Sequence, residues 1–213
     1  MTADAAHRAV DAVWRIESAR LIAGLARIVG DVGLAEELAQ DALVVALERW
    51  PESGIPDNPG AWLMATAKNR AIDVVRRAQR LARKREEIAV DLAAAKSEAP
   101  DVAEALDDDM GDDLLRLMFT ACHPVLSPDA RAALALRVLG GLTTDEIARA
   151  FVVPEPTIAQ RIVRAKRTLA DAHVAFEVPR GAERAPRLSS VLEVIYLVFN
   201  EGYSATAGDE WIR

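Results

Sequence analysis

The sequence has few of the features of a secreted, membrane-spanning or disulfide-stabilised protein. Its 213 residues include a single cysteine, Cys122, which excludes an intramolecular disulfide. No stretch approaches the roughly 20 uninterrupted apolar residues of a membrane span. The segment from Met1 to Arg15 mixes charges and lacks the apolar core of a signal peptide. These absences predict a soluble, reduced, cytoplasmic protein.

Aromatic residues are also scarce, at 5%, whereas apolar residues make up 51% and are dominated by Ala and Leu. Ala and Leu have the best helix propensities, so the composition predicts an all-α fold. The pair Cys122-His123 has no second cysteine, no metal-ligand spacing and no nearby partner set. We therefore expect no catalytic residue, no metal and no cofactor, and His123 before Pro124 is interpreted as closing a helix.

The charge is segregated along the chain. The formal net charge is -7, but residues 68–85 hold eight basic residues against one acidic residue, Asp73. Residues 97–115 hold eight acidic residues and no basic one. Such blocks indicate that different segments have different partners.

Helical patterns divide the chain into two modules. Helices are predicted over 4–29, 34–50, 59 to about 89, 113–122 and 128–139, with a further apolar helix beginning at Leu188. Asn58 before Pro59 is typical of a helix N-terminus. The acid-rich segment 93–112 is interpreted as a linker, either disordered or directed to a partner. The expected organisation is a domain at 4–92, this linker, a domain at 113–178 and the start of a third region at 187–213.

The third predicted helix has two unlike faces. An apolar stripe on one side comprises Leu63, Ala67, Val74, Ala78 and Leu81. The opposite side carries polar residues and one aromatic: Trp62, Thr66, Asn69, Asp73, Arg76, Arg77 and Arg80. This face suits nucleic acid, although Trp62 is equally compatible with a place in the core between the first three helices. Asp73 is interpreted as an ion-pair partner of Arg70, Arg76 or Arg77, because a carboxylate repels phosphate.

Residues 140–169, "GGLTTDEIARAFVVPEPTIAQRIVRAKRTL", have the pattern of a helix-turn-helix. Thr143 and Glu146 fit a capping box. In the second helix an inward apolar stripe recurs at spacings of 4, 3 and 4 and comprises Ile158, Ile162, Ala165 and Leu169. A separate polar face comprises Thr157, Gln160, Arg161, Arg164 and Thr168. Gln and Arg can read base edges in the major groove, so the pattern favours DNA binding over an ordinary helical hairpin with a solvated basic face.

Three blocks of the sequence, in order, resemble bacterial sigma factors of the extracytoplasmic-function group. "GDVGLAEELAQDALVVALERW" (residues 30–50) is similar to the block that binds the clamp helices of core RNA polymerase. "NPGAWLMATAKNRAIDVVRR" (residues 58–77) resembles the block that recognises and melts the minus-ten element. Residues 140–169 resemble the domain that reads the minus-thirty-five element. The resemblance covers about residues 10–90 and 113–172 and implies sigma domains 2 and 4.

The resemblance also implies roles for particular residues. Those implied to face polymerase, unless they form a merely solvated helix face, are Glu36, Glu37, Gln40 and Asp41. Those assigned to the minus-ten element are Trp62, Asn69, Arg76, Arg77 and Arg80. Those assigned to the minus-thirty-five element are Thr157, Gln160, Arg161, Arg164 and Arg167. The acidic linker would run towards the RNA exit path, and the loop at residues 51–60 would form a pocket wall for an extruded base.

A narrower resemblance concerns "CHPVLSPDARAALALRVLGGLTTDEIARAF", "AQRIVRAKR" and "IYLVFNEGYSAT". These segments resemble the subgroup with a long C-terminal extension of tetratricopeptide-like repeats, which implies that the chain is cut inside that extension. Val152 stands where glycine is frequent in the group, and Ala159 where lysine often sits. Implied partners are core RNA polymerase and promoter DNA, with an anti-sigma factor or the extension itself as a regulator.

The leading hypothesis from the sequence is a non-enzymatic transcription initiation factor that directs core polymerase to promoters. The alternative is a stand-alone helix-turn-helix regulator of duplex DNA, which leaves residues 30–85 without a purpose.

Overall fold

A computed structural model describes residues 3–90 and 110–205, and within these ranges every regular element is a helix. In the first half of the molecule the helices are α1 (Ala3–Val29), α2 (Val32–Ser53) and α3 (Pro59–Val90). In the second half they are α4 (Met110–Ala121), α5 (Pro128–Val138), α6 (Thr144–Ala150), α7 (Glu155–Asp171) and α8 (Arg184–Ala205), with a 3-10 turn at Gly181–Glu183 before α8. The all-α prediction is confirmed.

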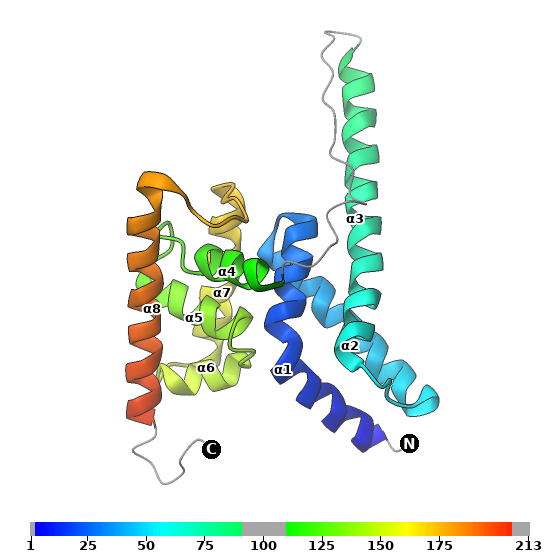
Figure 1. The fold of residues 1–213 in the computed structure, drawn as a ribbon, viewed down its shortest axis with the longest axis horizontal. Coiled ribbons are helices and arrows are strands. Elements are labelled where there is room, and N and C mark those ends of the chain that lie inside the picture. Colours follow the sequence, from blue (N-terminus) through cyan, green and yellow to red (C-terminus); the bar gives the residue numbers. More distant parts are fainter. Residues whose placement is uncertain (1–2, 91–109, 206–213) are drawn as a thin grey trace.

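The two halves pack against each other, with α1 between them (Figure 1). α1 contacts α2 and α3 on one side and α4 on the other, and α2 also touches α7. One cluster of buried side chains therefore runs through both halves, from Leu25 and Leu63 to Leu117, Leu134 and Ile158. The linker predicted at 93–112 lies mostly outside the described residues.

The helix starts follow local capping chemistry. The carboxylate of Asp31 accepts a hydrogen bond from the Leu34 amide (2.8 Å) at the start of α2. The predicted cap at Asn58 is confirmed, because its side-chain oxygen accepts from the Ala61 amide (3.0 Å). These bonds satisfy amides that have no partner within the helix.

The apolar stripe predicted on α3 is buried only in its first part. Leu63 and Ala67 are fully buried and Val74 is half-buried, whereas Ala78 and Leu81 are exposed. The reason is visible in Figure 1, where the far part of α3 extends beyond the other helices. The expectation that Ala78 and Leu81 pack into the core is therefore wrong, because no other helix in the described part of the chain covers them.

The start of α6 contains the capping box that the sequence predicts. The Glu146 amide donates to the Thr143 hydroxyl (3.2 Å), and the Thr143 amide donates to the Glu146 carboxylate (2.8 Å). This last bond holds the pKa of Glu146 below its ordinary value. At the other end of α6, in the turn that leads to α7, Val152 has a φ of 52° and is 90% exposed. A left-handed backbone explains why glycine suits this position.

Replacing Val152 with glycine is expected to raise the free energy of unfolding by about 1 kcal/mol, since a β-branched residue is strained in the left-handed region. Urea unfolding followed by circular dichroism measures the change. Val153→Gly is the matched control: Val153 is half-buried and has no positive φ, so this change should destabilise the protein. A loss of stability in Val152→Gly would contradict the argument.

Helix α8 packs on α4 and α5 through a second apolar cluster that includes Phe119, Val191 and Val194. Cys122 is also in this cluster, and burial raises the pKa of its thiol to about 11, so the thiol stays protonated. The neighbouring His123 accepts a hydrogen bond from the Val125 amide (3.1 Å) in the turn that follows α4, as its helix-closing interpretation requires. Among the described residues no helix has the length and apolarity needed to cross a membrane.

Candidate nucleic-acid interface

Helix α7 buries one face and offers another to solvent, as the sequence predicts. Its inward stripe of Ile158, Ile162, Ala165 and Leu169 is at most 5% exposed. The side chains of the opposite face that are exposed are Thr157, Gln160, Arg164 and Arg167, while Thr168 and Arg161 are half-buried. The N-terminal half of α7 is therefore free to meet another molecule.

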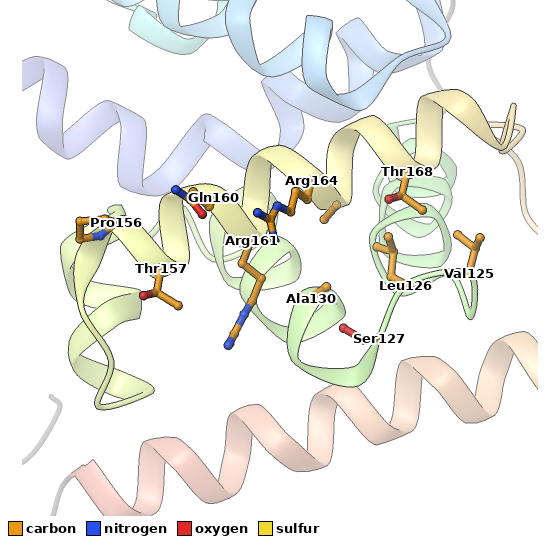
Figure 2. A pocket seen from close by; sticks show the side chains of 11 residues that line it. Val125, Leu126, Ser127, Ala130, Pro156, Thr157, Gln160, Arg161, Arg164 and Thr168 are labelled. Carbon is orange, nitrogen blue, oxygen red and sulfur yellow. The ribbon is translucent and has the colours of Figure 1, made fainter.

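A hollow of about 490 Å³ lies between this face of α7 and the start of α5. It is lined by Gln160, Arg161 and Arg164 of α7 (Figure 2). On the other side it is lined by Ala130 of α5 and by Ser127, the residue before α5. Two guanidinium groups and one carboxamide thus converge on a single concave surface. Such donors match the acceptors of base edges and phosphates.

Arg161 is held in place by two residues that the sequence did not single out. Its guanidinium lies over the ring of Phe151, with its Cζ 5.5 Å from the ring centroid. Its Nη2 atom also pairs with the Asp129 carboxylate at 3.5 Å. The side chain extends from α7 into the hollow (Figure 2) and is 22% exposed. Arg161 is therefore oriented before any ligand arrives, whereas Arg164 remains exposed.

The basic face predicted on α3 lies at the surface of the molecule. Asn69, Arg76, Arg77 and Arg80 are all exposed. Trp62, at the start of the helix, is half-buried and packs edge-on against Trp50, with 5.6 Å between ring centroids. The structure thus places Trp62 partly in the core, and the four polar residues at the surface.

The ion pair expected at Asp73 is not the one that forms. Arg70 pairs with Asp41 of α2 at 2.8 Å, and among the described residues Asp73 makes no ion pair with Arg70, Arg76 or Arg77. Arg70 lies on the side of α3 that faces α2, so it reaches a carboxylate across the helix interface. The sequence could not show this contact, because it depends on how the two helices pack.

The four residues assigned to polymerase on α2 differ in exposure. Glu37 and Asp41 are exposed and Gln40 is half-buried, whereas Glu36 is only 1% exposed. The Glu36 carboxylate pairs with Arg137 of α5 at 2.6 Å and with Lys166 of α7. Glu36 is thus covered by the other half of the molecule, in contrast to the surface position that the sequence led us to expect.

These features define a helical protein in which a helix-turn-helix and a second basic helix each present cations to solvent, the arrangement of a DNA-binding protein. Comparison with protein families gives the class more closely. Residues 16–81 match "Sigma-70 region 2" and residues 116–169 match "Sigma-70, region 4". The chain is therefore a protein of the sigma-70 type that carries regions 2 and 4 in this order.

Two curated relatives cover most of the chain. An uncharacterized protein of Rhizobium meliloti is 45% identical over 190 residues, which are 88% of this chain and 44% of that protein. The probable ECF RNA polymerase sigma factor SigI of Mycobacterium tuberculosis is 29% identical over 181 residues, which are 84% of this chain and 60% of SigI. The chain therefore spans about half the length of the curated relatives that it matches.

A solved structure of the sigma factor RpoE in complex with the anti-sigma factor NepR, from Bartonella quintana, is 25% identical to this chain. The match covers 72% of this chain and 88% of that one, with a TM-score of 0.25. At this TM-score the two folds do not superpose closely.

Proposed function

We propose that this protein is a non-enzymatic transcription initiation factor of the extracytoplasmic-function type, which binds core RNA polymerase and directs it to promoters in the cytoplasm. The observation that carries the proposal is the pair of exposed polar faces, one on α3 within region 2 and one on α7 within region 4. One such face is common among helical proteins. Two of them, on the two sigma-70 regions, match a reader of two promoter elements.

On α7, the proposed role of Gln160, Arg161 and Arg164 is to read and hold the minus-thirty-five element. A helix-turn-helix places the N-terminal part of its second helix in the major groove. Because Phe151 and Asp129 already orient Arg161, this residue suits a directional contact to a base edge. The exposed Arg164 suits a phosphate contact, which needs charge more than direction. Thr157 and Arg167 lie at the two ends of the same face.

On α3, the proposed role of Asn69, Arg76, Arg77 and Arg80 is to hold the separated strand of the minus-ten element. A row of cations follows a single-stranded backbone, and the bases are bound once they are unstacked. Trp62 is half-buried and packs against Trp50, so it supports this face from the start of the helix. On α2, the exposed Glu37 and Asp41 form the accessible part of the proposed polymerase surface.

Run-off transcription with purified core polymerase tests the proposed function. Core plus this protein is expected to give a start-site-specific transcript from a promoter selected by the protein, and the protein should co-elute with core in gel filtration. A protein that binds duplex DNA alone, without core and without producing a transcript, would instead be the stand-alone regulator. That alternative gives no role to the exposed basic face of α3.

The variants Arg161→Ala and Arg164→Ala are expected to weaken binding to the upstream element and to leave binding to core intact. Their effects should differ. Losing a directional base contact costs about 1–3 kcal/mol of discrimination at one base pair, so Arg161→Ala should relax sequence preference there. Arg164→Ala should weaken binding to all sequences about equally and lower the salt dependence by about one contact. Fluorescence anisotropy with a set of single-base variants measures both, and equal loss of core binding would indicate unfolding instead.

The finer assignment, to the subgroup with a tetratricopeptide-like C-terminal extension, belongs to this proposal. It is supported by the outer face of α8, where Leu188, Leu192, Ile195 and Tyr196 are 42–66% exposed. Apolar side chains in a row on one helix face favour a covering segment. An anti-sigma factor or such a segment would then be the regulatory partner.

A further inference from the structure

Ion pairs join the region 2 half of the molecule to the region 4 half. Arg27 of α1 pairs with the buried Asp113 of α4 at 3.2 Å. Glu36 of α2 pairs with Arg137 and Lys166. Arg15 of α1 pairs with Glu146 at 3.5 Å, but Arg15 is largely exposed and this pair contributes little. The pairs that matter are therefore the buried ones, and Glu36 takes part in two of them.

The surroundings of Glu36 make its burial conditional on the other half. Its Oε1 atom accepts hydrogen bonds from Arg137 Nε (2.6 Å) and from the Gln40 side chain (2.9 Å), and its Oε2 atom pairs with Lys166. A buried carboxylate is unfavourable unless cations and hydrogen bonds compensate for lost water. Both cations come from α5 and α7. If the two halves separate, Glu36 returns to solvent together with the face of α2 that carries it.

We infer that the Glu36 face of α2 has two mutually exclusive partners: the basic pair Arg137 and Lys166 of this chain, and core RNA polymerase. In the closed arrangement seen in the structure, the Glu36 carboxylate is bound by the basic pair. Polymerase can contact this carboxylate only when the region 4 half moves away. The inference rests on the proposed function, because it assigns polymerase to the face of α2 next to the exposed Glu37 and Asp41.

The packing around Glu36 leaves no room for a second partner. α7 lies so close to α2 that a Cβ atom added at Gly33 would be 3.6 Å from the Cβ of Lys166. A similar close approach occurs at Gly141, where an added Cβ would be 2.7 Å from the hydroxyl of Ser18 on α1. Glu37 and Asp41 remain accessible in the closed form, so they can make the first contact with polymerase. Glu36 joins that contact only after opening.

One test weakens the internal pairing without touching Glu36. Lys166→Gln removes a cation from the pair. Arg149→Gln is the matched control, because it removes one positive charge from an exposed residue of α6 that, among the described residues, pairs with Asp145 of the same helix. Binding to immobilised core polymerase is measured without DNA. Lys166→Gln is expected to bind core about fivefold or more tightly than wild type, which is the low end of the usual coupling between two sites, whereas Arg149→Gln should bind core like wild type.

A second test closes the molecule covalently. A Cβ atom added at Gly33 would lie 3.6 Å from the Cβ atom of Lys166. This distance is within the usual Cβ–Cβ range of disulfides, about 3.5–4.5 Å. The double variant Gly33→Cys with Lys166→Cys should therefore form a bridge between α2 and α7. Cys122 can remain, because it is buried. The oxidised double variant is expected to lose core binding at least tenfold, and dithiothreitol should restore it in the same sample. Mass spectrometry with thiol labelling reports the fraction that is bridged.

The outcomes separate this inference from the proposed function. If the oxidised form binds core as tightly as the reduced form, and Lys166→Gln binds like Arg149→Gln, the mutual exclusion is wrong although the protein is still an initiation factor. If wild type and Lys166→Gln both fail to bind core, the proposed function itself is wrong. If the cysteine variant fails to fold, neither form of it binds, and the comparison of Lys166→Gln with Arg149→Gln decides the question.

Discussion

Replacing Arg76, Arg77 and Arg80 together with glutamine is expected to lower the salt dependence of promoter opening. The slope of the logarithm of the binding constant against the logarithm of the salt concentration should fall by about two units, because each contact to a single-strand phosphate contributes roughly 0.7. The three side chains are exposed on one stretch of α3, so they can follow a strand without first breaking contacts inside the protein. The measurement is anisotropy of a labelled non-template strand bound to core plus this protein, between 50 and 200 mM salt, a range over which such contacts lose most of their strength.

A charge-matched control distinguishes a local contact from a general loss of attraction. Arg8, Arg180 and Arg184 are also exposed, but they lie at the starts of α1 and α8 and in the segment before α8. Changing these three to glutamine alters the net charge by the same amount. The control should leave the slope nearly unchanged. Equal effects of the two triple variants would show that only total charge matters, and would contradict the assignment of α3 to the strand.

The substitution with the largest expected effect on stability is Trp50→Ala. Trp50 is 0% exposed at the end of α2 and packs edge-on against Trp62 of α3. Removing so large a buried side chain typically costs about 3–5 kcal/mol, from lost burial and from the cavity that remains. In a protein of this size such a loss corresponds to a fall of about 10 °C in the thermal midpoint.

Trp50→Phe is the control for this substitution. The indole Nε1 of Trp50 is buried and has no hydrogen-bond partner among the residues that the structure describes, so phenylalanine removes a polar group that gains little from its surroundings. We expect Trp50→Phe to cost much less than Trp50→Ala. Urea unfolding gives both free energies. A loss below about 1 kcal/mol for Trp50→Ala would mean that the contact between α2 and α3 relaxes around the cavity.

Local chemistry made most of the helices predictable. Asn58 with Pro59, and Thr143 with Glu146, mark helix starts in a few consecutive residues, and both marks are confirmed by hydrogen bonds. The inward stripe of α7 was equally clear, because all of its spacings fall on one face of one helix. Periodicity failed to predict burial at the far end of α3, where Leu81 is exposed. An apolar stripe shows which side chains could be buried, and it does not show whether another helix is there to cover them.

The candidate site was predictable in its charges and not in its pairings. The basic faces of α3 and α7 follow from sequence spacing alone. The partner of Arg70 is Asp41, the partner of Arg161 is Asp129, and both lie in other helices. Contacts between residues far apart in the chain depend on how whole helices pack, and no spacing rule within one segment contains that information.

By itself the sequence determined that this protein is helical, where several of its helices begin, and that its acidic net charge conceals two basic helix faces. Only the tertiary structure decided which of those charges are available. The helix pattern predicted a surface position for Glu36, yet this side chain is only 1% exposed and lies between Arg137 and Lys166. The physical reason is that burial is a property of two surfaces in contact, and the second surface here comes from the other half of the molecule.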